Sequence, residues 1–188
     1  MALWQANKVA RDAASQQRYR NWLEQKRLEE NHLTRMLDML NEPFRTATEF
    51  FFSGTRLLAG IPSNIAPTPQ QDRQVYEFIE RFARETAKQE ATIYSYINMV
   101  AALRELHHSR GENAEADEYD GLLGDVTVAL NKTGDLREWL SDVDVIRAIP
   151  ADKFDELTIV NAAREAINAA ERRIARHLVR LYANPPSA

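Results

Sequence analysis

The 188-residue sequence contains no cysteine, which excludes disulfide frameworks, thiolate zinc sites, cysteine nucleophiles and cysteine-held iron–sulfur clusters. Glycine is also scarce, with six residues in the whole chain. The phosphate-binding motif G-x-x-x-x-G-K-[ST], the dinucleotide motif G-x-G-x-x-G and the hydrolase motif G-x-S-x-G are all absent. The sequence therefore does not predict a nucleotide-binding loop or a serine-hydrolase nucleophile.

Long hydrophobic runs are lacking too. The most apolar stretch centres on residues 50–52 and is far shorter than the ~18 residues of a membrane-spanning helix, so no transmembrane span is predicted. The amino terminus shows neither an apolar core nor a small-residue cleavage site, so we do not predict a secretory signal peptide. Together with the lack of cysteine, these features lead us to expect a protein of the cytoplasm or of a virion interior.

Helical periodicity dominates the sequence and predicts an all-α fold, an elongated antiparallel helical bundle with long coiled-coil-like helices. The clearest helix spans residues 69–110. Thr68, Pro69 and Gln71 form its predicted capping box, and Gly111 follows its end. A helix of this length is about 60 Å long. Its core-facing residues follow each other at steps of four and three: Val75, Ile79, Phe82, Thr86, Gln89, Ile93, Tyr96, Val100, Leu103 and His107.

The rest of the chain predicts further helices and a division into three parts. A helix over residues 3–41 is expected to stop at Pro43, and its first half carries too few apolar residues to bury much by itself. Residues 44–61 suggest two short helices or a helix and a loop, broken by Gly54 and Gly60. A helix after residue 111 is expected to end at Gly134, and a last helix over 152–183 to pack antiparallel against 69–110. The predicted parts are an amino-terminal helical arm (1–43), a Phe-rich segment with a proline linker (44–68) and the bundle core (69–188).

The uneven distribution of charge suggests contacts with other proteins. Residues 111–157 carry 13 acidic and 4 basic side chains, whereas both ends of the chain are mildly basic. We predict a non-enzymatic structural or adaptor subunit of a multi-protein assembly, for example of a virion or a secretion machine, present as a homo-oligomer or in a hetero-assembly, with no cofactor. Large apolar side chains are the expected contact residues, because they dominate interface energetics: Trp4, Trp22, Phe50, Phe51, Phe52, Leu57 and Leu58.

An alternative hypothesis is association with nucleic acid through the amino-terminal arm. There, basic residues alternate with aromatic ones, as in proteins that bind phosphates and stack bases. The net charge of -4 and the sequence pI of about 5.6 argue against this hypothesis. The basic residues concerned are Lys8, Arg11, Arg18, Arg20, Lys26 and Arg27.

A second alternative is a carboxylate-bridged di-metal enzyme, because the pattern Glu-x-x-His occurs twice. The two pairs are Glu29 with His32 and Glu105 with His108. Such a site needs two further glutamates from other helices, and the candidates are Glu165 or Glu171 and Glu115 or Glu118. The helical phase opposes this hypothesis, since Leu103 and His107 occupy the core-facing side of their helix.

Overall fold

The computed structural model describes residues 2–61, 68–183 and 185, and every regular element in these ranges is helical. The predicted all-α class is therefore confirmed. The elements in chain order are α1 (Ala2–Leu40), α2 (Glu42–Ala59), α3 (Pro69–Ser109), α4 (Asn113–Leu140), α5 (Val143–Ala148), the 3₁₀ helix η1 (Ala151–Glu156) and α6 (Thr158–Arg180).

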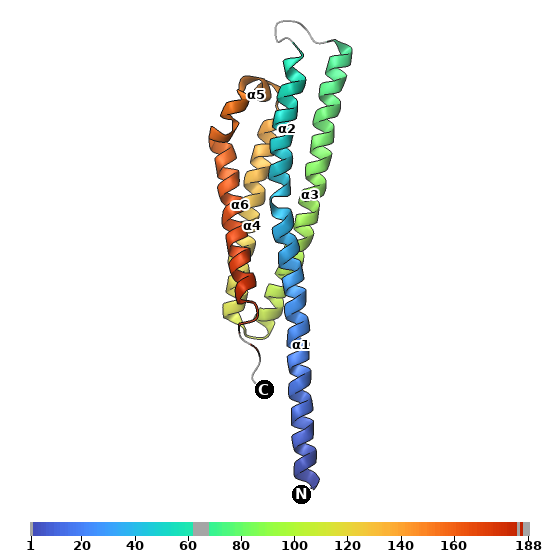
Figure 1. Ribbon diagram of the computed structural model, residues 1–188, viewed down its shortest axis with the longest axis vertical. Helices are drawn as coiled ribbons and strands as arrows, with labels where there is room; N and C mark the ends of the chain where they lie inside the picture. Colours follow the sequence, from blue (N-terminus) through green and yellow to red (C-terminus); the bar gives the residue numbers. More distant parts are fainter. Residues whose placement is uncertain (1, 62–67, 184, 186–188) are drawn as a thin grey trace.

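The long helices form an up-down-up-down bundle (Figure 1). Helices α1 and α2 follow one another in nearly the same direction, α3 returns beside them, α4 runs back up and α6 comes down again. Helix α6 packs mainly against α4 and α1. The expectation that α6 lies antiparallel to α3 was wrong, because both helices descend through the bundle and α4 stands between them in the chain.

The ends of α3 follow the sequence signals. The Thr68 hydroxyl accepts a hydrogen bond from the Gln71 amide, and the Gln71 side chain accepts one from the Thr68 amide, which completes the predicted capping box. Beyond the other end of the helix, Gly111 has a φ of 74°, a left-handed conformation that glycine adopts at little cost. Both predictions are confirmed, and they fix where the chain turns into α4.

Two predicted helix breaks are not breaks in the structure. Residues 42–59 form the single helix α2, which continues through Gly54. A Cβ there would lie 3.3 Å from Phe78 and 3.4 Å from Ile146, so the glycine allows close packing at this point. Helix α4 likewise continues past Gly134 to Leu140. Pro43 ends α1, yet it lies in the first turn of α2, where its missing N–H costs nothing.

The interior of the bundle contains a lower and an upper apolar cluster. The lower cluster joins α1, α3, α4 and α6, with Leu33, Val100, Leu122 and Ile174 among its fully buried members. The upper cluster joins α2 to α3, α4, α5, η1 and α6. The Phe-rich segment therefore packs into the bundle rather than beside it, with Phe51 fully buried and stacked on Phe154 at a ring distance of 4.2 Å.

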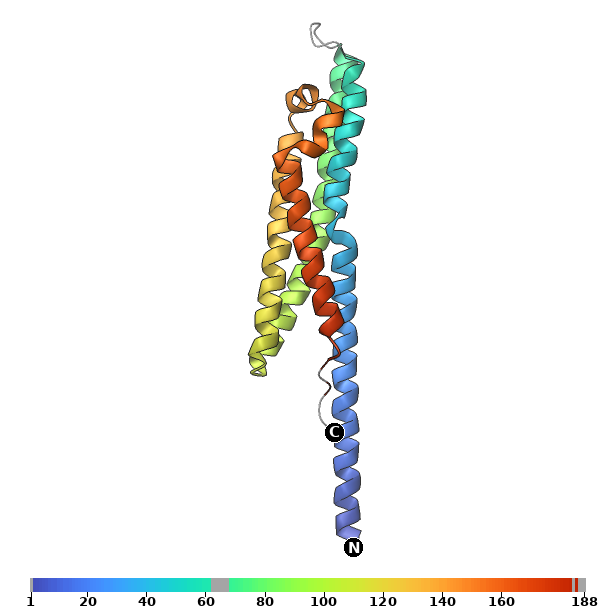
Figure 2. The ribbon, with the colours of Figure 1, turned by 60° about the vertical axis from the view of Figure 1, so that its left-hand side comes forward.

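One end of the molecule is a lone helix. The first half of α1 extends beyond the α3–α4 turn and past the end of α6, with no other helix alongside it (Figures 1 and 2). Within the described ranges, no helix is both long enough and apolar enough to cross a membrane.

Candidate functional site

The lone part of α1, residues 2–21, is called the overhang below. Its described side chains are exposed apart from Ser15, which is half-buried, and Trp4 and Val9 expose 70% and 68% of their surface. An isolated helix of about 20 residues is marginally stable in water, since packing supplies most of the stability of protein helices. The overhang therefore lacks the support that the rest of α1 receives from the bundle.

Cations and aromatic rings share one face of the overhang, which continues to the half-buried Trp22 just beyond it. Trp4, Lys8, Arg11, Arg18 and Trp22 are spaced four, three, seven and four residues apart, which places them along one side of the helix. The Lys8 ammonium lies over the Trp4 ring, 5.8 Å from its centroid.

The cations of the overhang also lack acidic partners. No carboxylate of the described part of the chain lies within ion-pair distance of Lys8, Arg11, Arg18 or Arg20. With four basic side chains and one acidic side chain, the overhang has a net charge of +3.

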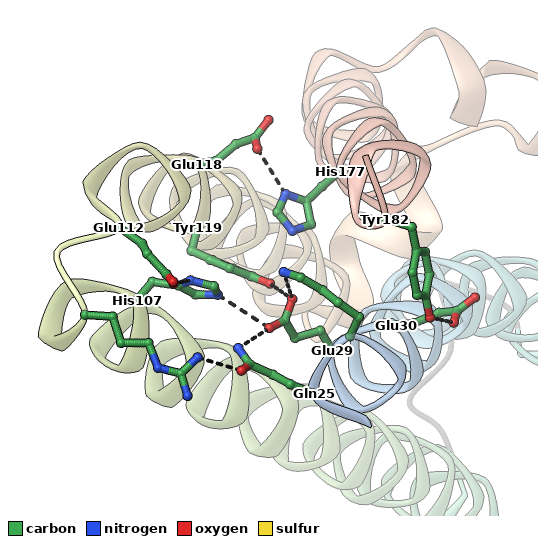
Figure 3. A network of polar contacts seen from close by, with 11 residues as sticks. Gln25, Glu29, Glu30, His107, Glu112, Glu118, Tyr119, His177 and Tyr182 are labelled. Carbon is green, nitrogen blue, oxygen red and sulfur yellow. Dashed lines mark hydrogen bonds and ion pairs between the residues drawn. The ribbon is translucent and has the colours of Figure 1, made fainter. Parts of the chain in front are cut away.

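A buried polar network fixes α1 where the overhang leaves the bundle (Figure 3). Its centre is the fully buried carboxylate of Glu29 on α1. This carboxylate accepts hydrogen bonds from Gln25 and Lys26, both at 2.8 Å, and from the Tyr119 hydroxyl of α4 at 3.1 Å. The His107 Nε2 of α3 lies 3.4 Å away. We call these five residues the neck network.

The charges of the neck network stabilise one another. Burial alone raises the pKa of Glu29, but the contacts from His107, Lys26 and Gln25 outweigh it and lower the pKa to about 2. The same contact with Glu29 raises the pKa of His107, whose Nδ1 lies 2.6 Å from Glu112. Burial next to the Glu29 carboxylate raises the pKa of Tyr119. Glu29 is therefore a carboxylate at neutral pH and holds α1 against α3 and α4.

Next to the neck network lies the buried His177 of α6, whose pKa is shifted in the opposite direction to that of His107. Burial lowers its pKa although Glu118 lies 3.3 Å from its Nδ1. Its Nε2 makes no hydrogen bond within the described part of the chain. The Tyr119 ring stands between the two histidines, with centroids 5.4 Å from His107 and 4.7 Å from His177. A recess of about 390 Å³ opens beside this layer and carries both acidic and basic side chains.

The structure separates the residues predicted to bind partners. Phe51 and Leu58 lie in the upper apolar cluster and are buried, so they are not accessible to a partner. Phe50 is 5% exposed, and Phe52 and Leu57 are half-buried. Trp22 is half-buried and contacts the Tyr182 ring edge-on, at 6.1 Å. Trp4 is the predicted contact residue that the structure leaves most exposed.

The residues of the di-metal hypothesis do not converge. Glu105 is exposed and pairs with Arg104, and His108 is also exposed. Glu29 is committed to the neck network, and its histidine partner there is His107 rather than His32. In the described ranges, no group of three or more His, Asp or Glu side chains is placed to hold a metal ion. Among the described residues, the further candidates Glu115, Glu118, Glu165 and Glu171 belong to no such group either.

Sequence reasoning missed the neck network because its members are far apart in the chain. Tyr119 lies 90 residues from Glu29, and neither the spacing nor the charge pattern links them. His107 appeared in the core-facing series of its helix, which was the one available signal that it is buried. Comparison with protein-family models, curated proteins and solved structures gave no match to this chain.

Proposed function

We propose that the protein is a non-enzymatic structural or adaptor subunit of a multi-protein assembly and that the overhang is its main contact element. The bundle serves as a rigid base, and the neck network sets the direction in which the overhang projects. The partner completes the packing that the overhang lacks, through contacts between helices.

The observation that carries this proposal is the exposure of the overhang. A helix of about 20 residues without tertiary contacts is stable only marginally, and a Trp side chain that is 70% exposed offers a large apolar surface. Aromatic anchors of this kind dominate the energetics of protein interfaces. A partner helix alongside the overhang would bury Trp4 and stabilise the helical backbone at the same time.

Nucleic-acid binding is the second candidate function, and one observation favours it. Lys8, Arg11 and Arg18 lie on the same face as Trp4 and Trp22, without acidic partners in the described part of the chain. Phosphates would pair with the cations while bases stack on the rings, and such affinity falls steeply as salt is raised.

Photo-crosslinking in the source cells tests the proposal. A photoreactive amino acid replaces Val9 on the overhang, and a matched variant carries it in place of Tyr94, which is 48% exposed on α3. We expect protein adducts from position 9 and far fewer from position 94. Adducts from position 9 that nuclease removes would instead support the second candidate, and equal labelling from both positions would contradict a specific role of the overhang.

A further inference from the structure

A shallow groove between α2 and α3 has an aromatic floor. The Phe50 ring stacks on Phe78 and on Phe82, with centroid distances of 4.4 and 3.8 Å. Ser53 is exposed at its edge, and the hollow has a volume of about 220 Å³, enough for one large side chain. We call this feature the aromatic groove. Phe50 and Phe82 are buried and Phe78 is half-buried, so the Phe78 ring is the part of the floor against which another aromatic ring can pack.

The rim of the aromatic groove is acidic. Glu49 and Glu85 line it and are both exposed, and Glu85 makes no ion pair within the described ranges. The nearest cation to Glu49 is the Arg45 Nε at 3.8 Å, in a solvent-exposed pair of the kind that contributes little. Arg81 also lines the groove, but it lies over the Phe78 ring, 5.9 Å from the centroid.

The overhang matches this groove in chemistry. It presents an exposed Trp4, with Lys8 and Arg11 on the same face and without acidic partners in the described part of the chain. The groove presents the carboxylates of Glu49 and Glu85 beside its aromatic lining, with Arg81 held over the Phe78 ring. The overhang cannot reach the groove of its own chain, because α2 continues nearly in the direction of α1, which places Trp4 and Phe50 about 70 Å apart. The fit is therefore between molecules.

A second overhang is a less favourable partner for the overhang than the aromatic groove is. Antiparallel pairing through the face that carries Trp4 and Trp22 places Lys8 of one copy opposite Arg18 of the other, so like charges face each other. Asp120 and Asp125 of α4 are also less available to the overhang, because they already pair with Arg104 and Arg173 of the same chain.

We propose that the occupant of the aromatic groove is the overhang of a second copy of this chain, with Trp4 packed into the hollow beside the Phe78 ring and Lys8 and Arg11 paired with Glu49 and Glu85. This inference rests on the proposed function and names the partner. The contact joins two different surfaces, so it is heterologous, and repetition of it produces a ring or an open chain of subunits.

Two variants, each with one defective surface, test the proposal by light-scattering mass. Trp4→Ala removes the anchor but keeps the groove, and Ser53→Trp fills the groove but keeps the overhang. We expect wild-type mass to rise above 21.6 kDa with concentration, each variant alone to stay near 21.6 kDa, and an equal mixture of the two to form a species of twice that mass. Loss of Trp4 should weaken association by about tenfold or more.

Matched controls guard against misfolding. Val9→Ala, on another side of the overhang, and Ser53→Ala, at the edge of the groove, alter exposed residues and should associate like the wild type. Circular dichroism should give the same helicity for all variants. If Trp4→Ala abolishes association but Ser53→Trp does not, the overhang remains the contact element and the groove assignment is wrong. If neither variant changes association, self-association uses neither surface. That result would contradict the groove assignment and also the role of the overhang in self-assembly.

The remaining outcomes are also decisive. Wild-type protein that stays at 21.6 kDa at every concentration overturns the second-copy assignment, while the crosslinking experiment still tests the overhang independently. A monomer whose mass increases only when oligo-dT of 30 nucleotides is added assigns the overhang to nucleic acid and overturns the groove proposal as well.

Discussion

Replacing the buried Glu29 with alanine is expected to destabilise the protein strongly. The carboxylate is fully buried, and its removal leaves the Lys26 ammonium and the Tyr119 hydroxyl without their acceptor and the His107 ring without its ion-pair partner. Removing one partner of a buried ion pair costs about 3–5 kcal/mol, because the other charge remains buried and unpaired. For a chain of this size the midpoint of thermal unfolding should fall by about 6–20 °C.

Denaturant and thermal unfolding followed by circular dichroism measure this loss. The matched control is Glu24→Ala, an exposed carboxylate on the same helix that should change the free energy of unfolding by less than about 0.5 kcal/mol. If Glu29→Ala costs no more than Glu24→Ala, the neck network does not hold α1 to the bundle. A second check is the double mutant with Tyr119→Phe, which should cost less than the sum of the two single changes.

Two further predictions concern α4 and α6. Gly134→Ala should stabilise the protein by about 0.5–1 kcal/mol in denaturant unfolding, because the new Cβ meets no atom within 4 Å. Gly121→Ala should gain less, because its Cβ would lie 2.5 Å from the Arg173 guanidinium, which would have to move from its ion pair with Asp125; equal effects at both sites would contradict this account. Burial lowers the pKa of His177, so between pH 7.5 and 5.5 the unfolded chain binds a proton that native His177 resists, and this residue makes the protein less stable as pH falls, whereas His107, whose pKa is raised, acts in the opposite direction. The His177→Leu variant should lose less over the same interval in thermal unfolding, and an identical loss would refute burial as the cause.

Local and periodic features of the sequence predicted a good part of this fold. The steps of four and three along residues 75–107 identified the buried side of α3, and Phe82, Ile93, Val100 and Leu103 are indeed buried. The poor apolar pattern in the first half of the first helix also predicted that it buries little, which the exposure of Trp4 and Val9 confirms. These signals succeed because burial of one helix face constrains residues that are close together in the sequence.

The errors arose where packing overrides local preference. A glycine inside a helix costs about 1 kcal/mol, which the surrounding contacts of α2 and α4 outweigh, so neither Gly54 nor Gly134 ends its helix. The neck network could not be predicted, since Glu29, His107 and Tyr119 come from three helices that only the tertiary fold brings together. The aromatic groove depends in the same way on the packing of α2 against α3.

Hydrogen exchange of the purified protein at low concentration tests the central claim most directly, namely that the overhang lacks support within its own chain. We predict that amides of residues 4–21 exchange far faster than those of residues 93–107, because a lone helix opens readily whereas the buried part of α3 opens only with the bundle. The exchange of residues 4–21 should slow when a partner binds. Slow exchange of both segments in a dilute monomer would contradict the account, because it would show that the overhang is already held by contacts within the chain.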